Sequence, residues 1–443
     1  MFEISDNNQL LSNNQVNNRK QNKQLNSLGI KKKLICISFI MFVIIILLLI
    51  IINNVLYETP SDYSFKAIYD LSKGKKNLFY NSQTDNVKIW IGGRPYNSIN
   101  STFYCDGECE VYIKIDISNL TSLSGMFENT KIRSISFSPN FNTKNIKDMS
   151  NLFRGCNELR SIDMSHFDTS NVVNMSSIFS GCASLTLLDL SLLNTEKVTD
   201  MSFMFSGCGS LKSLDISNLN TKNVVNMKYM FNKTILTSID LSHFDTSNVE
   251  DMSYMFYYSY NLVSLNLYNL NAEKVIDMSY MFYYCDNLQS LNISNFKTKN
   301  VENMSHMFHY ASSLTSIELS HFDTKNAKYM DYMFSQCSKL ISVNLSNFNI
   351  VNTLRMDYMF QSCTRLPSIN ISNFETTSIT AITGMFYDCG RLSSVDISSF
   401  TIPNTFSTIR ILNNSPGKGT ITLKKECADK VYSIPSTWTK ILV

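Results

Sequence analysis

The chain has 443 residues, an ordinary hydrophobic content of 44% and a formal net charge of +3. Six lysines and arginines but only two acidic residues lie within residues 1–33, so this segment carries +4 and the rest of the chain −1. A near-neutral body lacks the basic stripe that nucleic-acid binding requires. We therefore expect no nucleic-acid partner, and a body that can bury a large core.

Two segments of different character open the chain. Residues 1–33 are rich in Asn, Gln and Ser, and such a segment cannot bury enough apolar surface to offset its ordering entropy. We predict a disordered cytosolic tail there. Residues 34–52 are 19 residues without a charge. A helix of that length spans about 28 Å, the thickness of a bilayer core, so we predict a transmembrane segment over 34–52.

The charges beside the apolar run predict its orientation. Residues 31–33 are all lysine, whereas Glu58 and Asp62 follow the run. Positive residues stay on the cytosolic side, so we expect a single-pass plasma-membrane protein with a cytosolic N-terminus and extracellular repeats. A cleaved signal peptide is the alternative. The run is long for one and no small-x-small cleavage site follows it, which favours an uncleaved signal anchor.

From about residue 111 the sequence repeats itself. A phenylalanine recurs eleven times after an apolar residue, in nine steps of 26 residues and one of 25. These residues are Phe127, Phe153, Phe179, Phe205, Phe231, Phe256, Phe282, Phe308, Phe334, Phe360 and Phe386. Self-similarity at such a period is the signature of a solenoid.

Each unit begins with the leucine-rich-repeat pattern L-x-x-L-x-L-x-x-F/L, in which a short alternation predicts one strand. Its second half has a 3-3-1 apolar spacing, which suits a tight helical turn. The predicted fold is a leucine-rich-repeat-like solenoid with a parallel β strand and a short helical or irregular return per unit, preceded by one transmembrane helix. We divide the chain into a tail (1–33), a span (34–52), a membrane-proximal region and N-terminal cap (53–110), a solenoid (111–400) and a C-terminal cap (401–443).

The repeat resembles the bacterial surface-protein repeat, the BspA-like branch of the leucine-rich repeats. The motif that carries the resemblance reads LTSIDLSHFDTSNVEDMSYMF at residues 236–256. The resemblance covers about residues 111–400, and it implies a surface-exposed protein that takes part in adhesion or host contact, with no enzymatic role. Bacterial members usually carry a cleaved signal or a lipid anchor, and the anchor predicted for this chain departs from that.

Sulfur-containing side chains fall in columns that follow the repeat. Eighteen methionines fill two columns and seven cysteines fill a third, at a position where other units place Thr234, Ser259 or Ala311. Thioethers could bind Cu(I), but methionine also fills core gaps, and a column with the period of the fold is a core column. Disulfides between neighbouring rungs stay an alternative for the cysteines. We expect no metal and no cofactor.

Two smaller groups stand apart from these columns. Cys105 and Cys109 flank a glycine-containing turn before the repeats, and in an oxidising exterior we predict a local disulfide between them. His306 and His309 are i,i+3 neighbours. We interpret them as exposed surface residues rather than as a metal pair.

An acidic column occupies the strand position between the two inward residues. Its first four members are Asp163, Asp189, Asp215 and Asp240, and we expect them on the concave face of the solenoid. Carboxylates stacked about 5 Å apart repel by roughly 0.8 kcal/mol per neighbour in a water-like dielectric. We interpret the column as a solvated polar face, with relief by calcium, a cation or a glycan as the alternative.

Aromatic residues form the last columns and provide the candidate binding surface. Its members are Tyr254, Tyr257, Tyr258, Tyr280, Tyr283, Tyr284 and Tyr310. A rigid, partly exposed aromatic patch is the usual form of a binding hot spot, although stacking that only stabilises the rungs is the alternative. We therefore predict recognition of a protein or glycan on a host cell, matrix or neighbouring cell. The rival function is a structural or spacer protein of the envelope without a specific ligand.

Overall fold

A computed structural model describes residues 17–20, 23, 30–33, 35, 37–49, 60–70, 78, 87–96, 107–402, 409–415, 417–432 and 434–443. The chain forms two compact units, Met1–Pro60 with Gly92–Arg94, and Ser61–Ile91 with Pro95–Val443. In the first unit, the helix Ile30–Leu49 is long and apolar enough to cross a membrane, judged by length and composition. It overlaps the predicted span, whose residues 34, 36 and 50–52 lie outside the described residues, as does most of the predicted tail.

One sheet joins the N-terminal cap to the first repeats. Its strand order is β3-β2-β4-β1-β5-β6. Strand β1 pairs antiparallel with β4 and β5, whereas β5 pairs in parallel with β6, so parallel pairing begins where the repeats begin. The strands are β1 (Phe65–Asp70), β2 (Lys88–Ile91), β3 (Arg94–Tyr96), β4 (Glu108–Lys114), β5 (Ile132–Phe137) and β6 (Ser161–Asp163).

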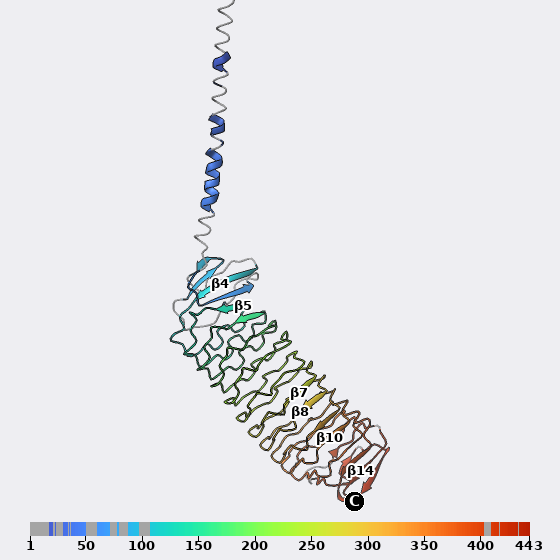
Figure 1. The fold of residues 1–443 in the computed structure, drawn as a ribbon. Helices are drawn as coiled ribbons and strands as arrows, with labels where there is room; N and C mark the ends of the chain where they lie inside the picture. Colours follow the sequence, from blue (N-terminus) through green and yellow to red (C-terminus); the bar gives the residue numbers. More distant parts are fainter. Residues whose placement is uncertain are drawn as a thin grey trace, which may run out of the picture. The chain divides into compact units, whose positions relative to one another are not determined.

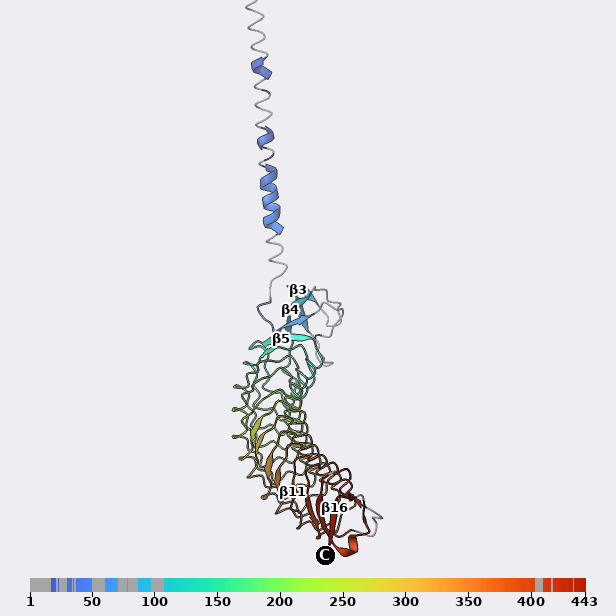
Figure 2. The same cartoon turned by 90° about the vertical axis from the view of Figure 1, so that its right-hand side faces the viewer.

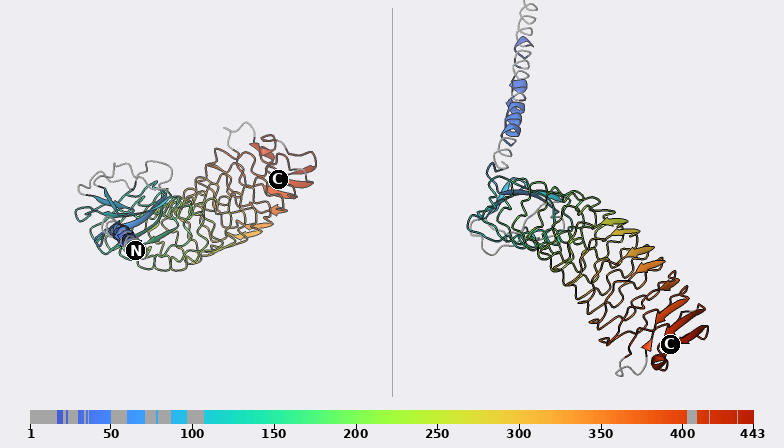
Figure 3. Two further views of the ribbon diagram at one scale, coloured as in Figure 1. Left: turned by 90° about the horizontal axis from the view of Figure 1, so that it is seen from above. Right: turned by 60° about the horizontal axis from the view of Figure 1, so that its bottom comes forward.

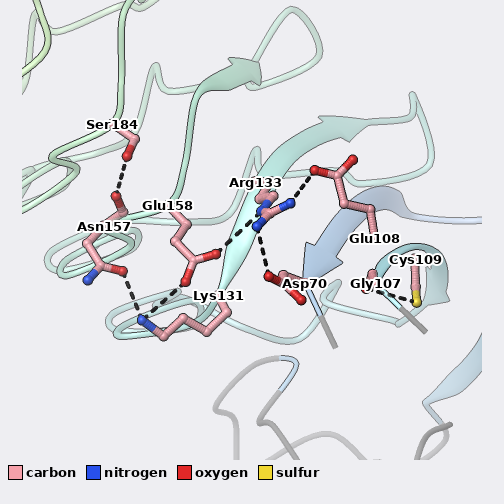
Figure 4. A network of polar contacts seen from close by, with 9 residues as sticks. All are labelled: Asp70, Gly107, Glu108, Cys109, Lys131, Arg133, Asn157, Glu158 and Ser184. Carbon is pink, nitrogen blue, oxygen red and sulfur yellow. Dashed lines mark hydrogen bonds and ion pairs between the residues drawn. The ribbon is translucent and has the colours of Figure 1, made fainter. Parts of the chain in front are cut away.

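Ion pairs hold this junction together. Arg133 on β5 binds Asp70 of β1 at 2.8 Å and also pairs with Glu108 of β4 (Figure 4). The Nε of Arg133 also lies 3.4 Å from Glu158 in the next rung. The Nζ of Lys131 contacts the same carboxylate at 3.4 Å. The side chains of Arg133 and Asp70 are both largely covered, so this pair is screened less than the pair with the exposed Glu108.

The repeats stack as rungs of one coil, in chain order from the β5 end to the β14 end (Figure 1), and a second direction of view shows the same stacking (Figure 2). Short strands line one side of the coil (Figure 3). They are β7 (Ser264–Asn266), β8 (Ser290–Asn292), β9 (Ser316–Glu318), β10 (Ser342–Asn344), β11 (Ser368–Ile369) and β12 (Ser394–Ile397). The pairing of β7 with β8 is parallel and joins Ser264 to Ser290, one repeat later. A second line of parallel bridges runs through the return segments, from Ser122 to Ala381.

The return segments are turns, so the irregular form of the prediction is confirmed and the helical form is wrong for the described repeats. Alternate amides donate to the next rung, as Tyr280 N does to Ser305 O at 3.0 Å. The amides between them close turns three residues back, as Met281 N does to Met278 O at 3.4 Å. This division of donors leaves none for the i→i−4 ladder of a helix.

The core is built from columns that repeat with the rungs. All eleven repeat phenylalanines are buried, and consecutive rings stack with centroids 5.2–6.1 Å apart. The two methionine columns and the seven cysteines are buried with them, so the core interpretation of these residues is confirmed. Each ring is stabilised by its neighbours on both sides, which no single unit could provide.

A buried threonine in the FDTSNV segment links most rungs to the next, although Ala272 and Ile350 replace it in two of them, and the sequence reasoning missed it. Thr169 Oγ1 donates to Asn194 O at 2.8 Å and accepts from Asn194 N at 2.8 Å. The same pair of bonds recurs at Thr143, Thr195, Thr324 and Thr376. One side chain therefore satisfies both backbone groups of a residue in the following rung.

The strand ladder continues past residue 400, into the segment expected to be a cap. Strands β12, β14 (Gly419–Leu423) and β16 (Trp438–Leu442) are consecutive and parallel. On the return side β13 (Ile409–Arg410) pairs with β15 (Val431–Tyr432), and the 3-10 helix η1 spans Lys425–Cys427. Trp438 is buried at this end.

Candidate functional site

An aromatic ladder runs through the return segments at the position two residues before the repeat phenylalanine. Its rings stack nearly parallel, with centroids 4.3–5.1 Å apart. It comprises Phe203, Tyr229, Tyr254, Tyr280, His306, Tyr332 and Tyr358. All of these rings are half-buried, because each covers the faces of its neighbours.

The predicted binding residues lie beside and within this ladder. Tyr257 stacks on Tyr283 at 4.9 Å, and Tyr284 stacks on Tyr258 at 4.7 Å and on Tyr310 at 4.1 Å. Edge and tilted contacts join these rings to the ladder. The structure thus brings together all seven predicted tyrosines, which we call the tyrosine face: Tyr254, Tyr257, Tyr258, Tyr280, Tyr283, Tyr284 and Tyr310.

The chemistry of the tyrosine face follows from this stacking. Most ring faces are covered by neighbouring rings, and Lys233 Nζ lies 5.9 Å from the ring centre of Tyr258, so edges and hydroxyl groups are the main groups left for a partner. Burial raises the pKa of Tyr254 to about 12 and that of Tyr284 to about 12. These hydroxyls therefore stay protonated at neutral pH and can both donate and accept hydrogen bonds.

Five of the seven tyrosines have a left-handed backbone: Tyr254 and Tyr280 of the ladder, with φ of 60° and 58°, and three in the column two residues after the repeat phenylalanine. Tyr258, Tyr284 and Tyr310 have φ of 57°, 57° and 61°, in the left-handed region. This conformation costs a non-glycine residue roughly 1–2 kcal/mol. Earlier rungs place Gly155, Gly181 and Gly207 in the same column, with φ of 70°, 75° and 73°. The fold can therefore be built without tyrosine here, and glycine adopts the conformation without strain.

The histidine pair belongs to the aromatic stack, and its interpretation as exposed was wrong. His309 is buried and His306 half-buried, and their Nδ1 atoms are 2.9 Å apart, so one ring donates to the other. Burial lowers the pKa of His306 to about 4 and that of His309 to about 3, which keeps both neutral. Among the described residues, no cluster of three or more His, Cys, Asp or Glu side chains could hold a metal ion.

The acidic column closes the turn at the end of each strand segment. Asp163, Asp189, Asp215 and Asp240 are exposed, and each accepts the backbone N–H of the serine two residues later at 2.9–3.0 Å. These hydrogen bonds lower the pKa of all four carboxyl groups, so they are charged at neutral pH. Asn266 and Glu318 make the same bond in later rungs, which explains why amides replace carboxylates there.

The cysteines of the described residues fall into two groups. The seven repeat cysteines are free and buried, and their thiols lie near carbonyls of the preceding rung, as Cys285 Sγ does to Phe256 O at 3.2 Å. Burial raises the pKa of Cys208 to about 12, so the thiol is a packing group that donates a weak hydrogen bond. Cys109 is disulfide-bonded, and its predicted partner Cys105 lies outside the described residues.

The repeats match a known protein family. A family described as "Mycoplasma protein of unknown function, DUF285" matches residues 98–187, 121–232, 179–290, 259–366 and 338–416. No curated protein matches the chain.

Several solved structures are similar at low identity. A leucine-rich repeat protein from Bacteroides ovatus is 15% identical, with a TM-score of 0.32, over 77% of this chain and 90% of that one. A leucine-rich cell surface protein from Faecalibacterium prausnitzii is 18% identical, with a TM-score of 0.38, over 73% and 88%. The functional domain of InlJ from Listeria monocytogenes, which includes a cysteine ladder, is 14% identical, with a TM-score of 0.23, over 71% and 76%.

Proposed function

The chain belongs to the DUF285 family, whose repeats are of the BspA-like leucine-rich type, and we propose on that premise that it recognises a ligand at the cell surface through its tyrosine face. The ligand is a protein or glycan on a host cell, matrix or neighbouring cell. The proposed role is binding and not catalysis. In this proposal the rungs hold the tyrosines in place, and the tyrosines contact the ligand.

The observation that carries this proposal is the left-handed backbone of Tyr258, Tyr284 and Tyr310. Stacking of these rings repays part of the strain, at about 0.5–1.5 kcal/mol per pair. The backbone of this column is left-handed in every rung; three other rungs place glycine there, which avoids the strain, and five place the smaller or flexible residues Asn129, Lys233, Gln336, Ser362 and Asp388. Bulky residues in a costly conformation on a partly exposed surface are typical of sites kept for contact with a partner.

The helix Ile30–Leu49 supports the membrane part of the proposal, because its length and composition fit a bilayer. The lysines at residues 31–33 begin that helix. By the positive-inside rule they place the N-terminus in the cytosol and the repeats outside the plasma membrane. The buried thiols of the repeats would be protected from oxidation there.

The test uses a variant in which two rungs take the sequence of two others. The substitutions Tyr257→Ser, Tyr258→Gly, Tyr283→Ser and Tyr284→Gly convert both rungs to the Phe-Ser-Gly found at residues 179–181 and 205–207. The full chain in labelled liposomes is applied to an array of extracellular-matrix proteins and glycans. We expect wild-type binding to at least one spot and about tenfold or greater loss in the variant.

Circular dichroism checks that the variant keeps the wild-type fold. Equal binding by both proteins would remove the tyrosine face as the contact surface. A wild-type chain that binds nothing beyond empty liposomes would favour the spacer function.

A further inference from the structure

One rung departs from the side-chain pattern of all the others. At the strand position occupied by serine in the neighbouring rungs, for example Ser161 and Ser213, it has Leu187. At the position occupied by histidine or asparagine, for example His166, it has Leu192. The two leucines are 73% and 62% exposed, and Leu187 is the most exposed large apolar side chain among the described residues.

The departure coincides with an opening in the strand ladder. Among the described strands, β6 pairs with β5 alone; residues 186–190 of the next rung form no strand, nor do residues 211–216 of the rung after it, so the leucine rung begins a longer gap in the ladder. A cavity of about 240 Å³ lies between the β6 rung and the leucine rung. Ile162, Met164 and Leu192 contribute apolar walls to it. Pockets for drug-sized ligands are about 300–1,000 Å³, so this one suits a single side chain.

Two carboxylates flank the apolar walls. Asp163 and Asp189 line the cavity, one from each rung. Both are ionised at neutral pH, because serine hydrogen bonds hold their pKa values below the usual range. None of the ion pairs formed within the described residues involves either carboxylate. The cavity therefore offers negative charge beside an apolar wall, and no lysine or arginine is among the residues that line it.

We propose that this cavity binds an arginine or lysine side chain presented by an extended segment of a partner protein. The aliphatic stem of such a side chain packs against Met164 and Leu192, and its cationic head lies between Asp163 and Asp189. Leu187 provides an apolar contact for the next residue of the segment. This surface is on the strand side of the rungs, whereas the tyrosine face lies in the return segments, so it is a second site.

The test uses a fluorescein-labelled peptide of eight residues that alternates arginine and valine, titrated with the full chain in detergent micelles. Fluorescence anisotropy measures the dissociation constant. A peptide that alternates glutamate and valine is the charge control. We expect the arginine peptide to bind, the glutamate peptide to fail, and the affinity to fall as salt is raised.

Three variants use residues that the chain already carries in the same columns. The double variant Leu187→Ser, Leu192→Asn and the single variant Asp189→Asn should each weaken binding of the arginine peptide about fivefold or more. The matched control Asp240→Asn removes the same charge away from the cavity and should change affinity by less than about twofold. Circular dichroism confirms that each variant is folded.

Unchanged affinity in both cavity variants, or equal binding of the arginine and glutamate peptides, would overturn the proposal. An equal loss with Asp240→Asn would also overturn it, because the peptide would then sense only the overall charge of the column. Since none of these variants alters the tyrosine face, the result is independent of the proposed ligand of that face.

Discussion

Replacing Tyr284 by glycine and by alanine separates the two forces that act on the tyrosine face. Its ring stacks on Tyr258 at 4.7 Å and on Tyr310 at 4.1 Å, and either substitution loses both pairs. At about 0.5–1.5 kcal/mol per pair, the loss is about 1–3 kcal/mol. The left-handed backbone, with φ of 57°, adds a penalty of roughly 1–2 kcal/mol that alanine keeps and glycine avoids.

Glycine also gives the unfolded chain more conformational freedom than alanine does, which lowers the free energy of unfolding of the glycine variant by about 0.4–1 kcal/mol. The free energy of unfolding of Tyr284→Gly should therefore exceed that of Tyr284→Ala by about 0.5–1 kcal/mol. This order is the reverse of the usual one, in which alanine is favoured. Urea denaturation of the full chain, followed by circular dichroism, measures the difference.

The exposed Gln289, whose φ is not positive, is the matched control. There the alanine variant should be the more stable of the two. An alanine variant at position 284 that equals or exceeds the glycine variant in stability would refute the reasoning from backbone strain.

Three further predictions concern the interior of the repeats. Iodoacetamide should modify the seven repeat cysteines in urea but not in the native chain, because these thiols are buried and burial raises their pKa values. Rapid labelling of the native chain, measured by mass spectrometry, would contradict this. Because burial lowers the pKa of His306 to about 4 and that of His309 to about 3, the unfolded chain binds protons first as the pH falls below about 6.5. The stability present at neutral pH should therefore be lost toward pH 4. A His306→Tyr, His309→Ser variant should lose less free energy of unfolding between pH 6.5 and 4.5. Urea titrations that show the same pH dependence of this free energy in both proteins would contradict the prediction. Thr195→Val removes two hydrogen bonds to Asn220, of 2.9 and 2.7 Å, and should lower the free energy of unfolding by about 2 kcal/mol or more, whereas a change below about 0.5 kcal/mol would show that the threonine bonds are dispensable.

The period and the core columns could be predicted from sequence because burial recurs with the fold. Phe282, Met278 and Cys285 occupy positions whose apolar or small character repeats in every rung, and such repetition has a simple structural cause. The clustering of the tyrosines was predictable for the same reason, since residues one period apart must be neighbours in a solenoid.

Backbone conformation was not predictable in the same way. A 3-3-1 apolar spacing fits a helical turn, and it fits overlapping turns equally well, because both place the same side chains toward the core. Nothing in the residue type of Tyr284 announces a positive φ, which is rare for a bulky side chain. The double bond made by Thr169 was also hidden, because the motif shows a recurring threonine and not its partner in the next rung.

The cavity beside Leu192 is marked in the sequence by an interruption of the repeat pattern and not by a recurring residue. Columns are found by what recurs, whereas Leu187 and Leu192 stand out because they interrupt two polar columns. A local alternation such as LLDL cannot show whether neighbouring strands will pair. The opening between β6 and the next rung therefore required the structure.

Hydroxyl-radical footprinting bears most directly on the tyrosine face as a contact surface. The full chain is oxidised with and without the ligand that the array identifies, and mass spectrometry measures oxidation of each tyrosine. Tyr260 and Tyr268, which are 49% and 50% exposed and lie outside the tyrosine face, are internal references. We predict that the ligand protects Tyr257, Tyr258, Tyr283 and Tyr284 and leaves both references unchanged. Protection of the references without protection of the tyrosine face would contradict a binding role for these tyrosines.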